Sequence, residues 1–258
     1  MSLAKTTIKY VRSLHQKKFR QNYNKFIVEG DKLVRESLFQ RQFPLEALFA
    51  TEAWLLDNAS ILPKDATKIE QVSGADLERM SQLSTPNEAL AVLEQKNHEA
   101  DPVLLKSDQS LFLDKIMDPG NFGTMLRIAD WFGIRQVFYS PDCVEPYNFK
   151  VVQASMGAIF RVRFVEMDLT VLHEKFPEVH LTGTDMEGES VYSFEPKAGG
   201  ITVIGSEHHG IRAEYRSLVN NFVSIPRFPG SGSESLNAAV ATGIICAFLR
   251  KVDGEKHR

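Results

Sequence analysis

Cysteine is scarce in this 258-residue sequence, which holds only Cys143 and Cys246, far apart in the chain. Two distant thiols form neither the disulfide framework of a small secreted domain nor the paired CxxC ligands of a zinc site. Long apolar runs are missing too, since none reaches the roughly 18–20 residues of a membrane span. The first residues also lack the apolar stretch of a signal peptide. We therefore expect a cytoplasmic protein with free thiols, no membrane segment and no metal site.

Net charge is small as well, at −3, but the charges are unevenly distributed. Residues 1–35 hold nine Lys and Arg against two acids, whereas residues 36–110 hold thirteen acids and six bases. A basic arm of this kind is typical of a segment that meets a polyanion. We expect RNA contacts from these basic residues: Lys9, Arg12, Lys17, Lys18, Arg20 and Lys32.

Aromatic residues interleave the bases of this arm, namely Tyr10, Phe19, Tyr23 and Phe26. Aromatic rings beside cations suit stacking on unpaired RNA bases. The alternative is a solvated basic helix face whose aromatic rings pack on the neighbouring domain. Both interpretations are compatible with the pattern.

Strand-like and helix-like patterns alternate along the chain in two series. The first series has expected helices over 8–20, from Gly30 to Phe39, over 52–57 and over 75–83, and expected strands at 26–28, 45–50, 68–72 and 89–93. The polar residues that follow include Asp101-Pro102. We therefore expect a small α/β domain over 1–100, a linker over 101–109 and a second domain over 110–258.

The second series follows the same alternation. Its expected strands are 111–113, 137–139, 162–165, 180–184, 201–204 and 222–225, and its expected helices are 122–132, 149–160, 169–176, 213–220 and 235–252. The last helix is rich in Ala and apolar on most faces, so we expect it to be largely buried. The fold class is α/β.

The most informative stretch is Asp118-Pro119-Gly120-Asn121-Phe122-Gly123, between an expected strand and an expected helix. A tight turn there places the Asn121 amide and a helix N-terminus at the carboxyl edge of a strand, where open α/β sheets bind ligands. Arg127 is out of phase with the apolar stripe of the helix and should project outward. An ordinary turn followed by a solvated arginine is the alternative.

Two later stretches have the same design of strand, small-residue loop and helix. In the first, Gly205 and Gly210 have the spacing of a phosphate loop, but Ile211-Arg212 replaces the required Lys-Ser/Thr. Glu207 is either a functional carboxylate or a helix cap. The neighbouring His208 and His209 have no second Cys or His cluster with which to bind zinc.

The second of these stretches runs from Phe222 to Asn237 through a Gly/Ser loop. Ser235 has the character of an N-cap, which predicts that it begins the last helix. A hydroxyl and an amide at a helix start can also hold polar groups of a ligand. Ser235 and Asn237 are therefore candidate site residues.

Taken together and in order, the three stretches resemble the three motifs of the SpoU (TrmH-like) branch of the SPOUT methyltransferases. The resemblance covers residues 110–252. More loosely, Phe26-Ile27-Val28-Glu29-Gly30-Asp31-Lys32 resembles the opening of the family's RNA-binding domain. The resemblance implies a parallel sheet with a C-terminal trefoil knot, preceded by a small α/β RNA-binding domain, and a homodimer.

The activity implied by this resemblance is 2′-O-methylation of a ribose in structured RNA, with S-adenosylmethionine as the cofactor. The matching catalytic side chains are Asn121, Arg127, Glu207, Ser235 and Asn237, and cofactor contacts are implied around Gly205, Gly210, Ile225 and Leu236. An arginine is a poor base because its pKa exceeds ~12, so we expect Arg127 to act as a fixed cation. The front domain favours rRNA as the substrate.

Two alternatives are a tRNA ribose methyltransferase and a non-catalytic RNA-binding assembly factor. A nucleotide-hydrolysing enzyme is disfavoured by the missing Lys-Ser/Thr. The chain departs from the family pattern in a longer loop with Arg227-Phe228-Pro229, in His208-His209, and in a partial match over 84–88. These departures bear on the cofactor loop and on RNA specificity.

Overall fold

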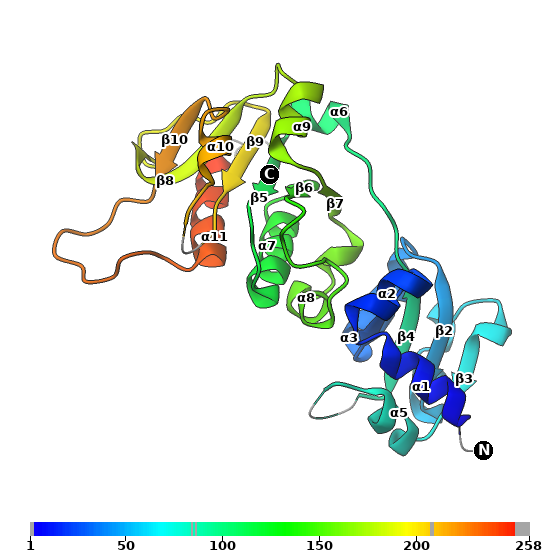
Figure 1. Ribbon diagram of the computed structural model, residues 1–258. Coiled ribbons are helices and arrows are strands. Elements are labelled where there is room, and N and C mark those ends of the chain that lie inside the picture. The colour runs from blue at the N-terminus through cyan, green and yellow to red at the C-terminus, as the bar shows by residue number, and fades with distance from the viewer. Residues whose placement is uncertain (1–2, 84, 86, 207–208, 251–258) are drawn as a thin grey trace. The chain divides into compact units, whose positions relative to one another are not determined.

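The computed structural model describes most of the chain in two compact units (Figure 1). The described residues are 3–83, 85, 87–206 and 209–250. The first unit comprises Met1–Asn97 and Glu145–Arg161, and the second comprises His98–Val144 and Val162–Arg258. Within the described residues, no helix has the length and apolar character needed to cross a membrane.

The first unit is built on a mixed four-stranded sheet of order β1-β4-β2-β3. Strand β4 is antiparallel to β1 and β2, and β3 is parallel to β2. The strands are β1 (Lys25–Glu29), β2 (Leu45–Ala50), β3 (Ile69–Gln71) and β4 (Ala89–Glu94). The helices are α1 (Lys5–Ser13), α2 (Lys17–Tyr23), α3 (Asp31–Gln40), α4 (Glu52–Asp57), α5 (Gly74–Met80) and α8 (Phe149–Ser155), with 3-10 turns η1 (Ala59–Ile61), η2 (Ala66–Lys68) and η3 (Ala158–Phe160).

The single helix predicted over 8–20 is in fact two helices, α1 and α2. The chain leaves α1 through tight i→i+3 bonds, such as that from the N–H of Leu14 to the carbonyl of Val11 at 3.1 Å. The break turns Leu14 inward, where it packs with Ile8 and Val11 of α1 into the core. Burial of Leu14 therefore accounts for the end of the helix.

Residues 145–161 lie in the predicted second domain by sequence, but their contacts group them with the first unit. The Tyr147 hydroxyl donates to the carbonyl of Lys96 at 2.5 Å and accepts from its N–H at 2.8 Å. The ring centres of Tyr147 and Phe26 lie 4.7 Å apart, and those of Phe160 and Phe43 lie 5.9 Å apart. Aromatic packing therefore completes the first unit with a segment from the middle of the chain.

The second unit has a six-stranded sheet of order β10-β8-β9-β5-β6-β7, in which every pair is parallel. Its strands are β5 (Gln109–Leu113), β6 (Gln136–Tyr139), β7 (Arg163–Glu166), β8 (Leu181–Ser190), β9 (Gly200–Ile204) and β10 (Asn221–Ser224). Its helices are α6 (Pro102–Ser107), α7 (Pro119–Trp131), α9 (Leu169–Lys175), α10 (Ala213–Arg216) and α11 (Ala238–Leu249). The predicted α/β class with a parallel sheet is confirmed.

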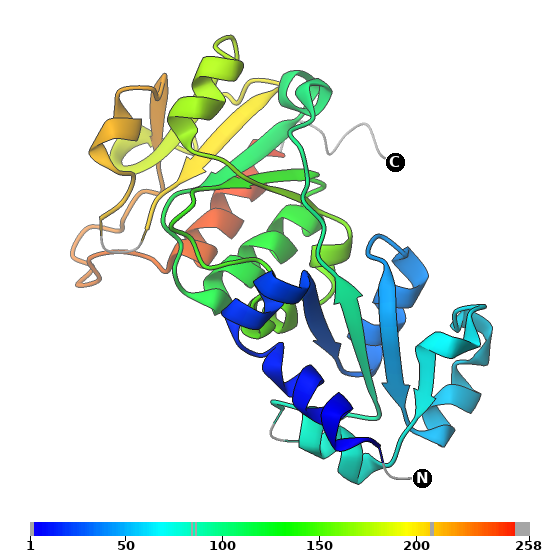
Figure 2. The ribbon, with the colours of Figure 1, turned by 45° about the vertical axis from the view of Figure 1, so that its right-hand side comes forward.

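Helices cover both faces of this sheet (Figure 2). Phe112, Phe138 and Val203 of the sheet pack with Leu172 of α9 and Tyr215 of α10 on one face. Helices α7 and α11 lie side by side on the other face. Burial on both faces explains why the strands read as continuous apolar runs.

One sequence-based expectation differs from the structure in this unit, and one is met. The predicted linker contains helix α6, whose first N–H groups at Val103 and Leu104 donate to the Asp101 carboxylate. Helix α11 is largely buried as expected, since Val240 and Ala247 are the exposed residues among the twelve that form it.

Candidate active site

The first motif lies where β5 ends and α7 begins. Oδ1 of Asp118 accepts a hydrogen bond from the N–H of Asn121 at 2.7 Å and so caps the helix. Pro119 occupies the first helical position, where its missing N–H costs nothing. These two residues place Asn121 in the first turn of α7, at the carboxyl edge of the parallel sheet.

Asn237 comes from far along the chain and reaches the same place. Its Nδ2 donates to Oδ1 of Asn121 at 3.0 Å. Its own Oδ1 accepts from the N–H groups of Ala239 and Val240 at 3.0 and 3.1 Å, which makes Asn237 the N-cap of α11. The prediction that Ser235 begins this helix is therefore wrong, and Ser235 lies exposed in the preceding irregular segment.

Arg127 projects from α7 as the sequence predicts. It is exposed, while Met125, Leu126 and Ala129 are buried. Arg127 lies six positions after Asn121, which on an α-helix means about 240° of rotation and about 9 Å of rise, so it stands apart from the Asn121–Asn237 pair. In the part of the chain that the structure describes, Arg127 has no hydrogen-bond or ion-pair partner.

The second motif forms a tight loop after β9. The backbones of Ser206 and Gly210 exchange two hydrogen bonds, at 3.1 and 2.9 Å. A Cβ at Gly205 would lie 2.2 Å from the carbonyl carbon of Gly210, so only glycine fits there. Gly210 itself has a φ of +63°, which also favours glycine. The predicted catalytic Glu207, with His208, lies outside the described residues.

The third motif follows β10 at the same edge of the sheet. Ile225 is half-buried just beyond the strand, and Leu236 is 46% exposed at the end of the long loop before α11. This loop projects from the rest of the second unit (Figure 1). Within it, Nη1 of Arg227 donates to the carbonyl of Ser233 at 3.2 Å. Gly205 and Ile225 thus directly follow β9 and β10, two strands of the same sheet.

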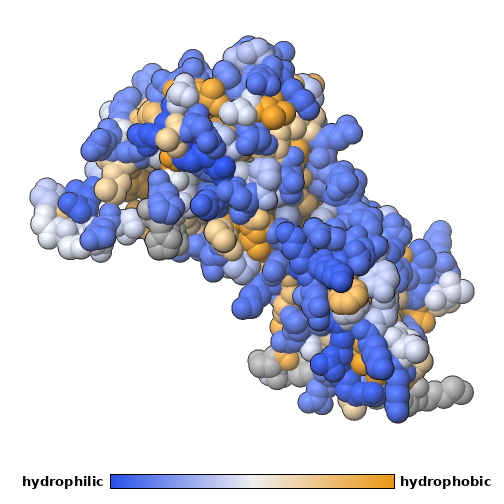
Figure 3. All heavy atoms as spheres, viewed as in Figure 1, coloured by the Kyte–Doolittle hydropathy of each residue, from blue (hydrophilic) through white to orange (hydrophobic). Residues whose placement is uncertain are grey.

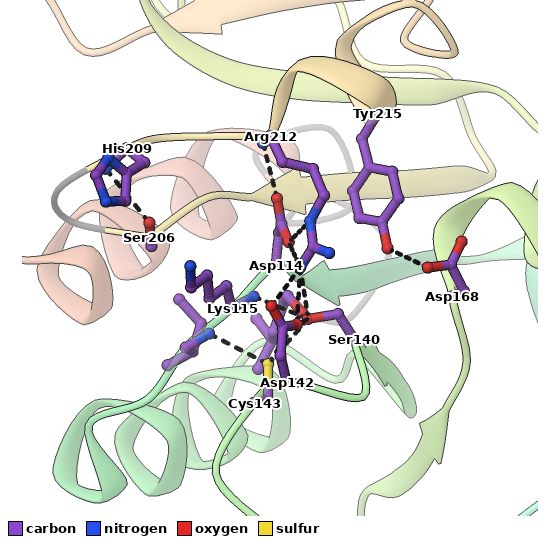
Figure 4. A network of polar contacts seen from close by, with 12 residues as sticks. Asp114, Lys115, Ser140, Asp142, Cys143, Asp168, Ser206, His209, Arg212 and Tyr215 are labelled. Carbon is purple, nitrogen blue, oxygen red and sulfur yellow. Dashed lines mark hydrogen bonds and ion pairs between the residues drawn. The ribbon is translucent and has the colours of Figure 1, made fainter.

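A cluster of polar side chains that the sequence patterns do not predict lies at this edge of the sheet (Figure 4). Asp114 follows β5 directly and its side chain is 1% exposed. Its carboxylate accepts from the backbone N–H of Arg212 at 2.9 Å and from Nε of Arg212 at 2.7 Å. A carboxylate directly after the buried run 111–113 is the signal that could have identified it.

The same guanidinium reaches a second carboxylate. Nη2 of Arg212 lies 2.7 and 2.9 Å from the two oxygens of Asp142, and 3.3 Å from Oγ of Ser140. Partial burial raises the pKa of Asp142, but hydrogen bonds from Ser140 and Arg212 outweigh it and hold that pKa below its ordinary value. The carboxylate is therefore ionised at neutral pH and pairs with Arg212.

Two further groups complete the cluster. The Arg212 guanidinium lies 4.5 Å from the centre of the Tyr215 ring, whose hydroxyl donates to Asp168 at 2.6 Å. Cys143 is buried, and burial raises the pKa of its thiol to about 11. The thiol is thus protonated at neutral pH and serves as a hydrogen-bonding core group. Among the described residues, no group of three or more His, Cys, Asp or Glu could hold a metal ion.

The basic arm of the first unit is mostly solvent-facing. The face that carries α1 and α2 is covered mainly by hydrophilic side chains (Figure 3). Five of the predicted RNA-binding residues are exposed: Lys9, Arg12, Lys17, Lys18 and Lys32. Part of this surface is hollowed, with a cavity of ≈ 450 Å³ bordered by Lys9, Arg12 and His15.

Arg20 is a correction to this assignment. Its side chain is 3% exposed, its Nη1 donates to the carbonyl of Leu14 at 2.8 Å, and its Nη2 pairs with Glu145. A guanidinium held in this way has no face left for a phosphate. The aromatic residues also serve the fold, since Phe26 is fully buried and the Tyr10 hydroxyl bonds Glu46.

Comparison with known proteins adds to this geometry. Residues 108–247 match the model of the SpoU rRNA Methylase family, and residues 5–91 match an MRM3-like substrate binding domain. The chain is 28% identical to the 23S rRNA (guanosine(2553)-2′-O)-methyltransferase RlmP of Bacillus subtilis, over 94% of this chain and 95% of that protein. It is 30% identical to the 23S rRNA (guanosine-2′-O-)-methyltransferase RlmB of Neisseria meningitidis, over 74% of this chain and 80% of that protein.

Among solved structures, the fold is similar to a Porphyromonas gingivalis protein assigned to the TrmH family of RNA methyltransferases. The TM-score is 0.86 at 35% identity, over 98% of this chain and all of that one. The fold is also that of AviRb from Streptomyces viridochromogenes, with a TM-score of 0.83 at 22% identity. The family predicted from the three motifs is confirmed: the chain belongs to the SpoU rRNA methylase family.

Proposed function

We propose that this protein transfers a methyl group from S-adenosylmethionine to a ribose 2′-hydroxyl of ribosomal RNA. The observation that carries the proposal is the Asn237–Asn121 hydrogen bond, which joins the first and third family motifs at the edge of the sheet where β9 presents the second. One relative that matches nearly the whole chain, RlmP of Bacillus subtilis, is named as a 23S rRNA 2′-O-methyltransferase. The match to a bacterial 23S rRNA methyltransferase supports a cytoplasmic site.

The residues at this edge fit the proposed cofactor. Gly205 and Ile225 each follow a strand, so their backbone groups are available to hold an adenosine through hydrogen bonds, with Gly210 and Leu236 beside them. When bound, S-adenosylmethionine supplies a methyl group on a sulfonium sulfur. The protein's task is to hold the two reactants in line, because proximity supplies much of the acceleration.

Arg127 is the proposed catalytic cation. Its guanidinium serves as a fixed cation that binds an RNA phosphate and stabilises the developing 2′-oxyanion. Asn121 and Asn237 supply amide groups at the start of two helices. Glu207 and Ser235 remain proposed members of the site, with Glu207, a phosphate or water as the proton acceptor.

We also propose a homodimer and a trefoil knot. Helices α7 and α11 present Trp131, which is 83% exposed, and Val240. A second copy on this face would cover these side chains and bring another subunit close to Arg127. The knot is proposed from the match of residues 108–247 to the SpoU rRNA Methylase family. Light scattering tests the dimer, and Trp131→Glu should yield monomers.

The two-domain division remains part of the proposal, with the first unit as the RNA-binding domain. The exposed lysines of its arm and the match to a substrate binding domain support this role. A tRNA substrate and a non-catalytic assembly factor are the alternatives. An assembly factor would bind RNA without any dependence on Arg127 or on the cofactor.

The deciding experiment is methyl transfer from labelled S-adenosylmethionine to total RNA from cells that lack the gene. Label that enters rRNA, in a nucleotide whose 3′ bond resists alkali, supports the proposal. Label found only in tRNA would favour the first alternative. Absence of label in any RNA fraction, with RNA binding intact, would favour an assembly factor.

A further inference from the structure

We infer that Arg212 and Asp114 are positioning residues that hold the described ends of the second-motif loop, residues 205–206 and 209–211, in their cofactor-binding positions. The inference rests on the proposed function, in which this loop holds S-adenosylmethionine. Neither residue is among the catalytic side chains that match the three family motifs.

Asp114 bonds both ends of the loop. Its backbone N–H donates to the carbonyl of Ile204, the last residue of β9, at 2.8 Å. Its carboxylate accepts from the backbone N–H of Arg212 at 2.9 Å. One residue of the β5 edge thus fixes the point where the loop leaves the sheet and the point where it returns.

The described ends of the loop have contacts of their own. The Ser206–Gly210 bridge joins them, and the side chain of Ile211 is 2% exposed in the core. Because Arg212 directly follows Ile211, a displacement of Arg212 would also displace Ile211 and the Ser206–Gly210 bridge. The positions of these residues therefore depend on where Arg212 is held.

Charge makes Arg212 hard to replace. Asp114 is buried, and a buried carboxylate without a partner is costly. The guanidinium satisfies Asp114 through Nε and Asp142 through Nη2, a forked geometry that lysine cannot reproduce. The Tyr215 ring lies against the same guanidinium.

The cluster also reaches the first motif. Oγ of Ser140 accepts the N–H of Lys115 at 2.9 Å, and Lys115 has a φ of +55°. This strained residue turns the chain from Asp114 toward Asp118 and Asn121. Arg212, through Ser140, therefore ties the cofactor loop to the segment that positions Asn121.

Arg216 provides a matched control on the same short helix. It pairs with Asp185, and its guanidinium lies 4.6 Å from the centre of the Phe222 ring. The chemistry resembles that of Arg212, but among the described contacts Arg216 bonds neither Asp114 nor any residue of the loop. Its loss should leave the loop in place.

The test is calorimetric binding of S-adenosylmethionine to the full-length protein and its variants. Arg212→Ala should weaken binding at least tenfold, Arg212→Lys should recover only part of that loss, and Arg216→Ala should stay within twofold of wild type. Should Arg212→Ala fail to fold, Asp142→Asn, at a more exposed position, should still weaken binding severalfold. At saturating cofactor, kcat should fall less than the KM for the cofactor rises.

The proposed function and the positioning role of Arg212 would be contradicted by different results. Wild-type protein that binds no S-adenosylmethionine would overturn the proposed function. Wild-type binding with an unchanged Kd in Arg212→Ala, or an equal loss in Arg216→Ala, would overturn the positioning role alone. Melting temperatures of both alanine variants separate loss of loop shape from loss of fold.

Discussion

The side-chain amide of Asn237 donates to Asn121 across a sequence separation of 116 residues, while its oxygen caps α11. One side chain thus begins one helix and joins it to the beginning of another. The two roles use different atoms, so they can be separated by substitution.

Asn237→Asp should lower methyl transfer with little loss of stability, because a carboxylate still accepts from the N–H groups of Ala239 and Val240 but cannot donate to Asn121. Asn237→Ala should lose both roles and about 1 kcal/mol of unfolding free energy. Urea denaturation and initial rates measure the two effects. Ser235→Ala should leave stability unchanged, and a loss equal to that of Asn237→Ala would contradict the assigned cap.

Arg127→Ala should abolish methyl transfer while binding of S-adenosylmethionine stays within twofold, since Arg127 faces solvent and supports no described contact. Arg127→Lys should keep a small part of the rate, because the charge remains but the planar fork is lost. Single-turnover rates and calorimetry provide the readouts. Arg135→Ala, at an exposed arginine in the same unit, is the control. Retained activity in Arg127→Ala would argue against the fixed-cation role.

Replacing Lys17 and Lys18 with Gln should weaken RNA binding and flatten its dependence on salt, since each phosphate contact contributes about 0.7–0.9 to the slope of log K against log salt. Substitution is preferable to deletion of residues 1–20, which would remove Ile8 and Leu14 from the core. Lys64→Gln, at an exposed position outside the arm, is the control. An unchanged slope would assign both lysines to solvated surface.

Arg20→Ala should destabilise the protein by about 3–5 kcal/mol, because it leaves the Glu145 carboxylate without its partner in a mostly buried site. Chemical denaturation measures this loss. The double variant Arg20→Met, Glu145→Met should regain most of it, since an apolar pair of similar volume avoids the buried charge. A destabilisation below ~1 kcal/mol would show that the pair is a surface pair of ordinary strength.

The thiols of Cys143 and Cys246 should react slowly with a thiol reagent at pH 7.5, and fully after unfolding. Burial raises their pKa values to about 11 and about 12, so the thiolate is scarce in the folded protein. A raised pKa contributes stability below the unfolded value, which is lost as pH rises toward the folded value. Unfolding free energy should therefore decline above about pH 8.5, and less steeply in Cys143→Ala. Rapid native labelling would contradict this.

Local signals predicted most elements well. Glu52–Asp57 is a helix with the predicted bounds, and the three motif loops lie at one edge of the parallel sheet as the family pattern implies. Strand-then-loop patterns are readable because apolar runs and glycines report on nearby backbone. The position of Asn121 follows from such local rules.

Long-range pairing explains the misses. In the phosphate-loop pattern Arg212 stands at the Ser/Thr position, and nothing near it in sequence reveals its pairing with Asp114. Arg20 matched the basic pattern of its arm, yet Glu145 lies 125 residues away. Ser235 and Asn237 both have cap character, and only the backbone decides between them.

The grouping of Glu145–Arg161 with the first unit has a consequence for biosynthesis. A ribosome must translate past Arg161 before Tyr147 and Phe160 can meet Phe26 and Phe43. Until then the nascent first unit exposes an apolar face, and it cannot finish folding before part of the second unit has emerged. Cutting the gene between the two matched family regions would give a first fragment that lacks part of its core and a second fragment that carries residues 145–161 without the unit they complete.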